Sequence, residues 1–309
     1  MEQGSAVPYL RPPSVIKRAP WEDSEERRVS NWITAWDFCE PIDAGLIGAP
    51  YSGASISASG AAGGPEAVRL AFRYNTTYSP DWDTDIQRLR VRDLGDIAGH
   101  LTSVETAHYR IEEAVKGALT VAEPFVPIII GGDHSITAPA VRGFCAANPG
   151  KKIGIINFDA HFDVRNFEHG PHNGTPFRQI IEGNLGIEGQ NVVEIGIHGF
   201  MNASRYYRWA LDHGMTIITA RRVEQIGMEA CINDALTMAL VFAPDLVTTQ
   251  ALYVDVELGD GPGHAGTYAD FWKLTGKPPN MHVALEVDVE RFMHLFVERM
   301  AGLAARTMM

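Results

Sequence analysis

Two carboxylates and an imidazole stand at alternate positions in the segment K-I-G-I-I-N-F-D-A-H-F-D-V-R, which covers residues 152–165. The apolar run 153–156 predicts a buried strand, and Asp159, His161 and Asp163 follow it at i, i+2 and i+4. Because alternate residues of an extended segment point to the same side, these three side chains could converge on one point. A divalent cation would explain so much buried negative charge, since unpaired buried carboxylates repel each other and take up protons.

Two further predicted strands end in side chains of the same kinds. The apolar run 125–130 leads into G-G-D-H-S, which places His134 at a strand end, and Asp255 and Glu257 share one face at the end of the run 251–256. A lone histidine is usually a hydrogen-bonded core residue, but the carboxyl ends of parallel strands meet at one ligand-binding edge of a sheet. Together the three segments offer two imidazoles and four carboxylates, which suit two divalent ions of the Mn, Fe, Co or Ni type.

Strands and helices alternate along the rest of the chain, and these elements must position the candidate ligands. We expect strands at 44–47, 91–97, 125–130, 153–156, 192–197, 215–219 and 251–256, and helices at 67–72, 103–122, from 178, 206–213 and 229–242. This alternation predicts an α/β fold with three α/β/α layers, in which helices flank a mostly parallel sheet. We expect residues 1–40 to form an N-terminal arm and residues 41–309 to form a single domain.

The glycine-rich stretch 48–64 lies between a predicted strand and a predicted helix. It lacks the Gly-Lys-Ser/Thr ending of a phosphate-binding P-loop and the tight GxGxxG spacing of dinucleotide-binding folds. A loop at the rim of a substrate pocket is therefore the better interpretation.

Composition restricts the possible partners. The chain has 309 residues and a net charge of -12 at pH 7, which disfavours nucleic acid and suits a small cationic substrate. The three cysteines, Cys39, Cys145 and Cys231, are too widely spaced for a CxxC zinc site or a disulfide framework. We find no apolar run of membrane length and no signal peptide, so a cytoplasmic protein with reduced thiols is expected.

The three candidate metal segments, G-G-D-H-S at 131–135, D-A-H-F-D at 159–163 and D-V-E at 255–257, together resemble the ureohydrolase family. That family includes arginase, agmatinase, guanidinobutyrase and formimidoylglutamase, and the resemblance extends from about residue 44 to about residue 299, with G-T-P-F at 174–177 and D-L-G-D at 93–96 also fitting. It implies an α/β/α fold and a pair of Mn ions that activate water to attack a guanidinium carbon and release urea.

The resemblance also implies roles for individual residues. His134, Asp159, His161, Asp163 and Asp255 match metal ligands of the family, and Glu257 falls where the family has Asp. In the catalytic roles, His172 matches a proton-shuttling histidine although Asn173 intervenes before the G-T-P-F stretch, and His169 is the reserve. Glu286 resembles a late carboxylate that orients the guanidinium, although a solvated carboxylate is an equally good interpretation.

Departures from the family pattern keep two hypotheses open. Glu257 is one methylene longer than Asp, the segment 260–280 differs from the pocket-building segment of relatives, and G-I-H-G at 196–199 lacks the family's strand arginine. One hypothesis is an active amidinohydrolase with Mn or Ni that accepts a substituted guanidine or a biguanide such as metformin. The other is a catalytically weak or inactive partner subunit that assembles with a catalytic paralogue in a hetero-oligomer. Family members form trimers or hexamers, so a homo- or hetero-oligomer is expected in either case. A Rossmann-like binder would leave the clustered acids and histidines unexplained.

Overall fold

The computed structural model describes residues 7–21, 23–80, 83–121, 124–226, 243–256, 267–288, 291–292 and 294. Its contacts divide the chain into two compact units, one up to residue 223 and one over residues 224–306. The expected arm over 1–40 and the expected single domain over 41–309 stay predictions.

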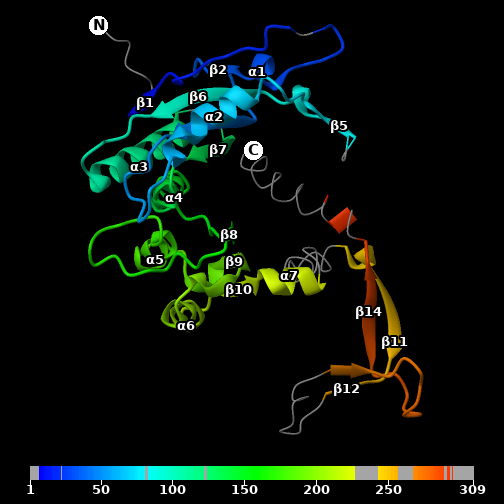
Figure 1. Cartoon of the computed structure of the whole chain (residues 1–309). Coiled ribbons are helices and arrows are strands. Elements are labelled where there is room, and N and C mark those ends of the chain that lie inside the picture. The colour runs from blue at the N-terminus through cyan, green and yellow to red at the C-terminus, as the bar shows by residue number, and fades with distance from the viewer. Residues whose placement is uncertain are drawn as a thin grey trace, which may run out of the picture. The chain divides into compact units, whose positions relative to one another are not determined.

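The first unit is built on parallel strands (Figure 1). Strand β3 (Ala44–Ala49) pairs in parallel with β6 (Val91–Ile97) on one side and with β7 (Val126–Gly131) on the other. The chain's first strands extend this sheet, because β2 (Thr34–Ala35) pairs in parallel and β1 (Leu10–Arg11) antiparallel with β6. The order of the main path is β1-β6-β3-β7, which leaves β7 as an end strand.

A second group of parallel strands follows in the same unit. Strand β9 (Val192–Ile197) lies between β8 (Ile155–Phe158) and β10 (Thr216–Thr219). A short antiparallel pair, β4 (Tyr78–Ser79) with β5 (Thr84–Asp85), stands apart from both sheets. Because every long strand pair of this unit is parallel, the predicted α/β fold with mostly parallel strands is confirmed.

Helices alternate with these strands along the chain. They are α1 (Val29–Trp32), α2 (Gly64–Ala71), α3 (Val104–Thr120), α4 (Thr137–Ala147), α5 (Pro176–Glu182), α6 (Ser204–Asp212) and α7 (Ala220–Ile226). Short 3-10 turns are η1 (Ala61–Gly63), η2 (Ile86–Arg88), η3 (His134–Ile136), η4 (Gly189–Asn191), η5 (Gly199–Met201) and η7 (Pro244–Leu246). Ser103 is the N-cap of α3, as predicted, and its hydroxyl accepts a hydrogen bond from the Thr106 amide. Helix α4 was not predicted.

Two apolar clusters hold the first unit together. One joins β3, β6 and α3 through buried side chains such as Ile47, Leu94 and Val115. The other joins α5 to β9 through Phe177, Ile180 and Val192. Ile129 of β7 packs against the first cluster and Ile155 of β8 against the second, so the two clusters support the strands that precede His134 and Asp159.

The predicted burial of the strands over 125–130 and 153–156 is wrong for one face of each. Ile128 in β7 is 42% exposed, and Ile156 and Phe158 in β8 are 45% and 66% exposed. The second strand also begins two residues later than predicted, at Ile155. Because β7 and β8 are end strands of their sheets, one edge of each has no strand neighbour among the described residues of this unit.

The second unit contains antiparallel pairs only among its described strands. Strand β11 (Val247–Leu252) pairs with β14 (Met281–Val287), and β12 (Val254–Val256) pairs with β13 (Thr267–Ala269). The single strand predicted over 251–256 is thus broken at Tyr253. The helix predicted over 229–242 lies outside the described residues, as does Cys231.

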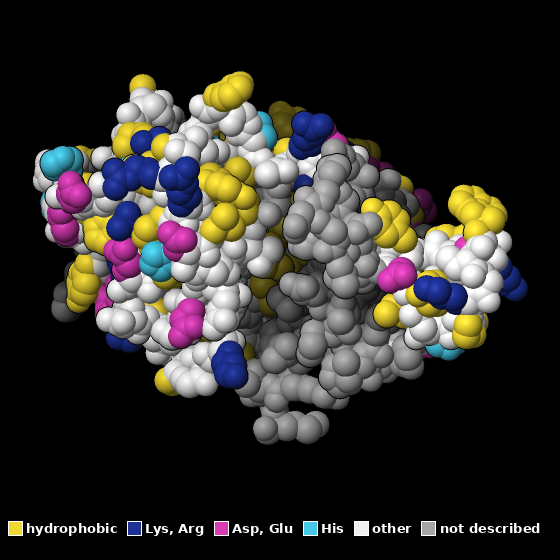
Figure 2. All heavy atoms as spheres, turned by 90° about the horizontal axis from the view of Figure 1, so that it is seen from below, with side chains coloured by type: hydrophobic (Ala, Val, Ile, Leu, Met, Phe, Trp, Pro, Cys, Tyr) yellow, Lys and Arg dark blue, Asp and Glu magenta, His cyan; other side chains and the backbone are white. Residues whose placement is uncertain are grey.

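On the face that Figure 2 shows, acidic, basic and histidine side chains are interspersed among the described residues. In the described part of the chain, no helix is both long and apolar enough to cross a membrane.

Candidate metal centre

Three of the predicted ligands converge at the carboxyl ends of β7 and β8. His134, Asp159 and Asp163 each offer a ligand atom, and these atoms lie within 4.8 Å of one another. The Nδ1 atom of His134 is 2.5 Å from a carboxylate oxygen of Asp163 and 3.5 Å from one of Asp159. One imidazole nitrogen facing two carboxylates from another strand end is a donor set that fits Mn²⁺.

A glycine turn places His134 at this point. A Cβ atom on Gly132 would lie 1.8 Å from the backbone oxygen of Tyr51, so only glycine allows the chain to pass there. Beyond the turn, the buried Asp133 carboxylate accepts hydrogen bonds from the amides of Ser135 and Ala54. The sequence G-G-D-H-S therefore fixes the direction of the imidazole through its backbone.

The aspartates are fixed by bonds at both ends of their loop. The Asp159 amide donates to the Ile195 carbonyl of β9 at 3.0 Å, which continues the sheet to this residue. The Phe177 amide at the start of α5 donates to the Asp163 carbonyl at 3.2 Å. Asp163 itself has a φ of +48°, a left-handed conformation that is uncommon for a residue other than glycine. Strained backbone of this kind persists where the surroundings determine it, and it is frequent at functional sites.

His161 lies beside the three converging residues. Its Nδ1 atom is 3.1 Å from an oxygen of Asp159, and its side chain is 42% exposed. It contacts one member of the group but is not itself within the group of mutually close ligand atoms. Its predicted role as a ligand stays a prediction.

The charges at the centre perturb one another. Burial lowers the pKa of His134, but the hydrogen bond and the charge of Asp163 outweigh burial and raise the pKa overall. Burial first, and then the nearby charges of Asp163 and Asp159, raise the pKa of Glu194 in β9 to about 8, although its hydrogen bond from Asn157 acts in the opposite direction. Such a concentration of carboxylates is stabilised by a bound cation, so the electrostatics also fit a metal.

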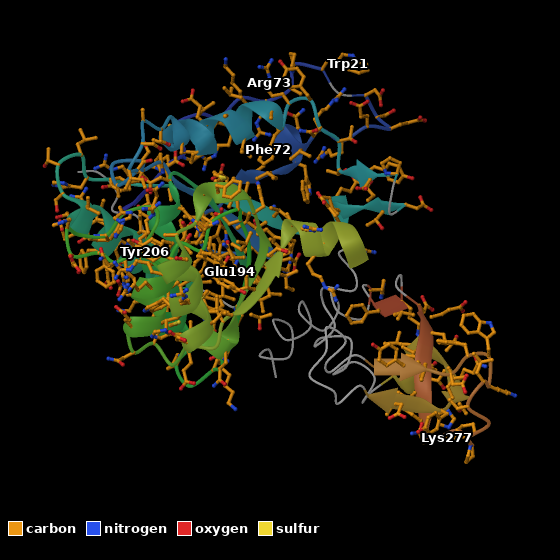
Figure 3. All side chains as sticks on the ribbon, turned by 60° about the horizontal axis from the view of Figure 1, so that its bottom comes forward. Trp21, Phe72, Arg73, Glu194, Tyr206 and Lys277 are labelled. Carbon is orange, nitrogen blue, oxygen red and sulfur yellow. The ribbon has the colours of Figure 1, made fainter. Side chains whose placement is uncertain are left out.

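Glu194 was not singled out from the sequence. It is fully buried, accepts a hydrogen bond from the Asn157 side chain at 2.7 Å, and keeps its Oε1 atom without a partner in the described part of the chain. Figure 3 shows it among the packed side chains of the first unit. The available signal was a lone carboxylate inside the apolar strand V-V-E-I-G-I.

The other two predicted ligands belong to the second unit. Asp255 lies in β12, where the Tyr253 hydroxyl donates to its carboxylate at 3.1 Å and the Lys277 ammonium lies 3.9 Å away. Lys277 also donates to the Tyr253 hydroxyl at 2.7 Å. Glu257 lies outside the described residues. The participation of both residues in the metal centre stays a prediction.

The predicted catalytic residues are placed differently from one another. His172 is half-buried, and its Nδ1 atom accepts a hydrogen bond from the Gly174 amide at 3.1 Å. Burial, and then the charge of Arg165, lower the pKa of His172, which favours the neutral imidazole. His169 is exposed, and so is Glu286 in β14. The roles of these three residues stay predictions.

The glycine-rich loop 48–64, predicted to line the rim of the pocket, is hydrogen-bonded to residues next to the candidate ligands. The Asn173 amide donates to the Ala54 carbonyl at 3.0 Å, and the Ile56 amide donates to the Asn173 side chain at 3.0 Å. Since Ala54 also donates to Asp133, the glycine-rich loop bridges the neighbours of His134 and His172.

Several known proteins are similar to this chain in sequence and fold. Residues 42–244 match the Arginase family. A formimidoylglutamase of Halalkalibacterium halodurans is 39% identical over 220 residues, which cover 71% of this chain and 68% of that protein. A solved formimidoylglutamase of Bacillus subtilis has a TM-score of 0.66 at 33% identity, covering 76% of this chain and 71% of that one. A Trypanosoma cruzi formiminoglutamase solved with Mn²⁺ has a TM-score of 0.61 at 29% identity, covering 69% and 71%.

Proposed function

Because the chain belongs to the arginase family, we propose that it is a manganese-dependent amidinohydrolase acting on an N-formimidoyl amino acid. The observation that carries this proposal is the convergence of His134, Asp159 and Asp163 at the strand ends. The substrate class is supported by the similarity to formimidoylglutamases, which are named for formimidoylglutamate.

We propose that the six residues predicted from the sequence are the metal ligands. His134, Asp159, His161, Asp163, Asp255 and Glu257 would hold two divalent ions. The Trypanosoma cruzi relative was solved with Mn²⁺, which favours Mn over the alternative, Ni. When bound, the ions supply an activated water molecule and polarise the amidine.

The predicted catalytic residues are assigned to transfer a proton and to orient the substrate. The hydrogen bond from the Gly174 amide occupies Nδ1 of His172, so we assign Nε2 to deliver a proton to the leaving nitrogen. The lowered pKa of His172 favours the neutral imidazole, which carries its proton on Nε2 because Nδ1 accepts from the Gly174 amide. Glu286 is assigned to orient the cationic amidine.

The reaction balances without a further reactant. Water adds to the amidine carbon, the C–N bond to the amino acid breaks, and the amine leaves with one proton. A formimidoyl group then yields formamide, whereas a guanidino group yields urea. The product therefore identifies the substrate class.

The test measures both products with the purified full-length chain and Mn²⁺. We expect formamide and free glutamate from N-formimidoylglutamate, and loss of this turnover in Asp163→Ala. Urea from agmatine, 4-guanidinobutyrate or metformin would instead establish a guanidine substrate. Absence of turnover on all four substrates, with Mn²⁺ or with Ni²⁺, would refute the activity of this chain alone.

One observation favours the second candidate function, an inactive partner of a catalytic paralogue. The Lys277 ammonium 3.9 Å from Asp255 competes with a metal ion for that carboxylate. In this case activity would arise only on mixing with the paralogue, in a hetero-oligomer. Light scattering of the chain alone and of the mixture separates a homotrimer or homohexamer from a mixed assembly.

A further inference from the structure

A single asparagine side chain binds the backbone on both sides of His161. Asn202 follows η5, in the loop that leaves β9. Its Nδ2 atom donates to the Ala160 carbonyl at 2.8 Å, and its Oδ1 atom accepts from the Phe162 amide at 3.1 Å. The side-chain amide of Asn202 thus makes the two hydrogen bonds that the backbone of a paired strand would otherwise make to residues 160 and 162.

This replacement occurs where regular pairing between β8 and β9 stops. The last bond of the ladder is the one from the Asp159 amide to Ile195. Beyond it, β9 ends and η5 begins. The His198 amide still donates to the Ala160 carbonyl over a long 3.4 Å, and the His161 amide donates to the side chain of its neighbour Asp159 at 2.9 Å. Four residues after the ladder ends, Asp163 adopts its left-handed φ of +48°. Regular strand pairing therefore does not by itself set the direction of the intervening backbone.

We propose that Asn202 is a positioning residue of the metal centre: its amide holds residues 160–162 so that the side chains of His161 and Asp163 point at the metal. The inference rests on the proposed function, since it concerns the same centre. Asparagine suits this role because it carries one donor and one acceptor on a short side chain. Aspartate keeps only the acceptor, and leucine keeps the approximate shape with neither.

The first experiment needs no metal. Amide hydrogen exchange is measured on the full chain in EDTA for the wild type, Asn202→Ala and Asn202→Leu. Removing the acceptor of the Phe162 amide should accelerate exchange of that amide by about tenfold or more. The matched control is Asn148→Ala, which deletes another bond from an asparagine side chain to the backbone, the one to Phe144 at 2.9 Å. It should leave the Phe162 amide unchanged.

The second experiment measures Mn²⁺ affinity by competition with a fluorescent chelator. Loss of a group that orients metal ligands typically weakens metal binding by about 10- to 100-fold. We expect this loss in Asn202→Ala and Asn202→Leu, a smaller loss in Asn202→Asp, and a change below about twofold in Asn148→Ala. The Asn202→Asp variant separates positioning from general destabilisation, since it restores one of the two bonds.

The outcomes distinguish this inference from the proposed function. Faster exchange of the Phe162 amide together with weaker Mn²⁺ binding in the Asn202 variants supports the positioning role of Asn202. Unchanged exchange, unchanged affinity, or an equal loss of affinity in Asn148→Ala overturns it while the proposed function stands. A wild-type chain that takes up no Mn²⁺ refutes the metal centre, and with it the role of Asn202 at that centre.

Discussion

The buried Glu194 gives the sharpest quantitative prediction, through the substitution Glu194→Gln. Burial raises the pKa of this carboxyl from 4.5 to about 8, so the folded, metal-free chain keeps it protonated at neutral pH. The unfolded chain ionises the same group near pH 4.5. Because the folded state holds the proton more tightly, the group's contribution to stability is fully present below pH 4.5 and is lost as pH rises to about 8. Glutamine resembles the protonated acid in shape and cannot ionise.

The magnitude follows from the size of the pKa difference. Each pH unit between the two pKa values changes the free energy of unfolding by about 1.4 kcal/mol. Across the interval from 4.5 to about 8, the difference between Glu194→Gln and the wild type should therefore grow in favour of the variant, by a total of about 5 kcal/mol. The new amide hydrogens of glutamine shift all values by a constant, so the slope with pH carries the test.

The assay is urea unfolding of both proteins in EDTA between pH 4 and pH 9. Bound metal must be absent because cations beside Asp159 and Asp163 would favour the ionised carboxyl. Glu66→Gln, at an exposed position in α2, is the control for loss of a carboxylate. A difference between Glu194→Gln and the wild type that stays constant across this pH range would refute the reasoning, because Glu194 would then ionise alike in both states.

Three further predictions concern the centre and its supports. Asp163→Ala removes a converging ligand and should weaken Mn²⁺ binding at least about 100-fold, measured by chelator competition; unchanged affinity would contradict the ligand assignment. Gly132→Ala places a Cβ atom 1.8 Å from a backbone oxygen and should cost about 3 kcal/mol in urea unfolding, whereas Gly60→Ala, with no heavy atom within 4 Å, should stay within about 0.5 kcal/mol. Lys277→Met removes the ammonium near Asp255 and should strengthen Mn²⁺ binding up to about fivefold if Asp255 is a ligand; no change would exclude the competition.

Local patterns were enough to predict much of the fold. The strands around Ile47, Leu94 and Ile195 and the helix capped by Ser103 follow from periodicity and capping, which act within a few residues. The convergence of His134 with Asp159 and Asp163 followed from the rule that parallel strands carry ligands at their carboxyl ends.

Other features depend on contacts between distant segments. The exposed faces of Ile128 and Ile156 reflect the end positions of their strands, which an apolar run does not reveal. The bonds from Asn202 join a loop after β9 to a loop after β8, some 40 residues apart, and no periodicity signals them. The antiparallel pairing of β11 with β14 was missed because a short apolar run does not specify its partner.

The central claim is that side chains from separate strand ends hold two metal ions. Anomalous X-ray diffraction at the manganese edge, on crystals of the full chain grown with Mn²⁺, tests it most directly. The account predicts two anomalous peaks within coordinating distance of His134, Asp159 and Asp163, with Asp255 beside the same pair. A crystal that shows no peak at these three residues would contradict it.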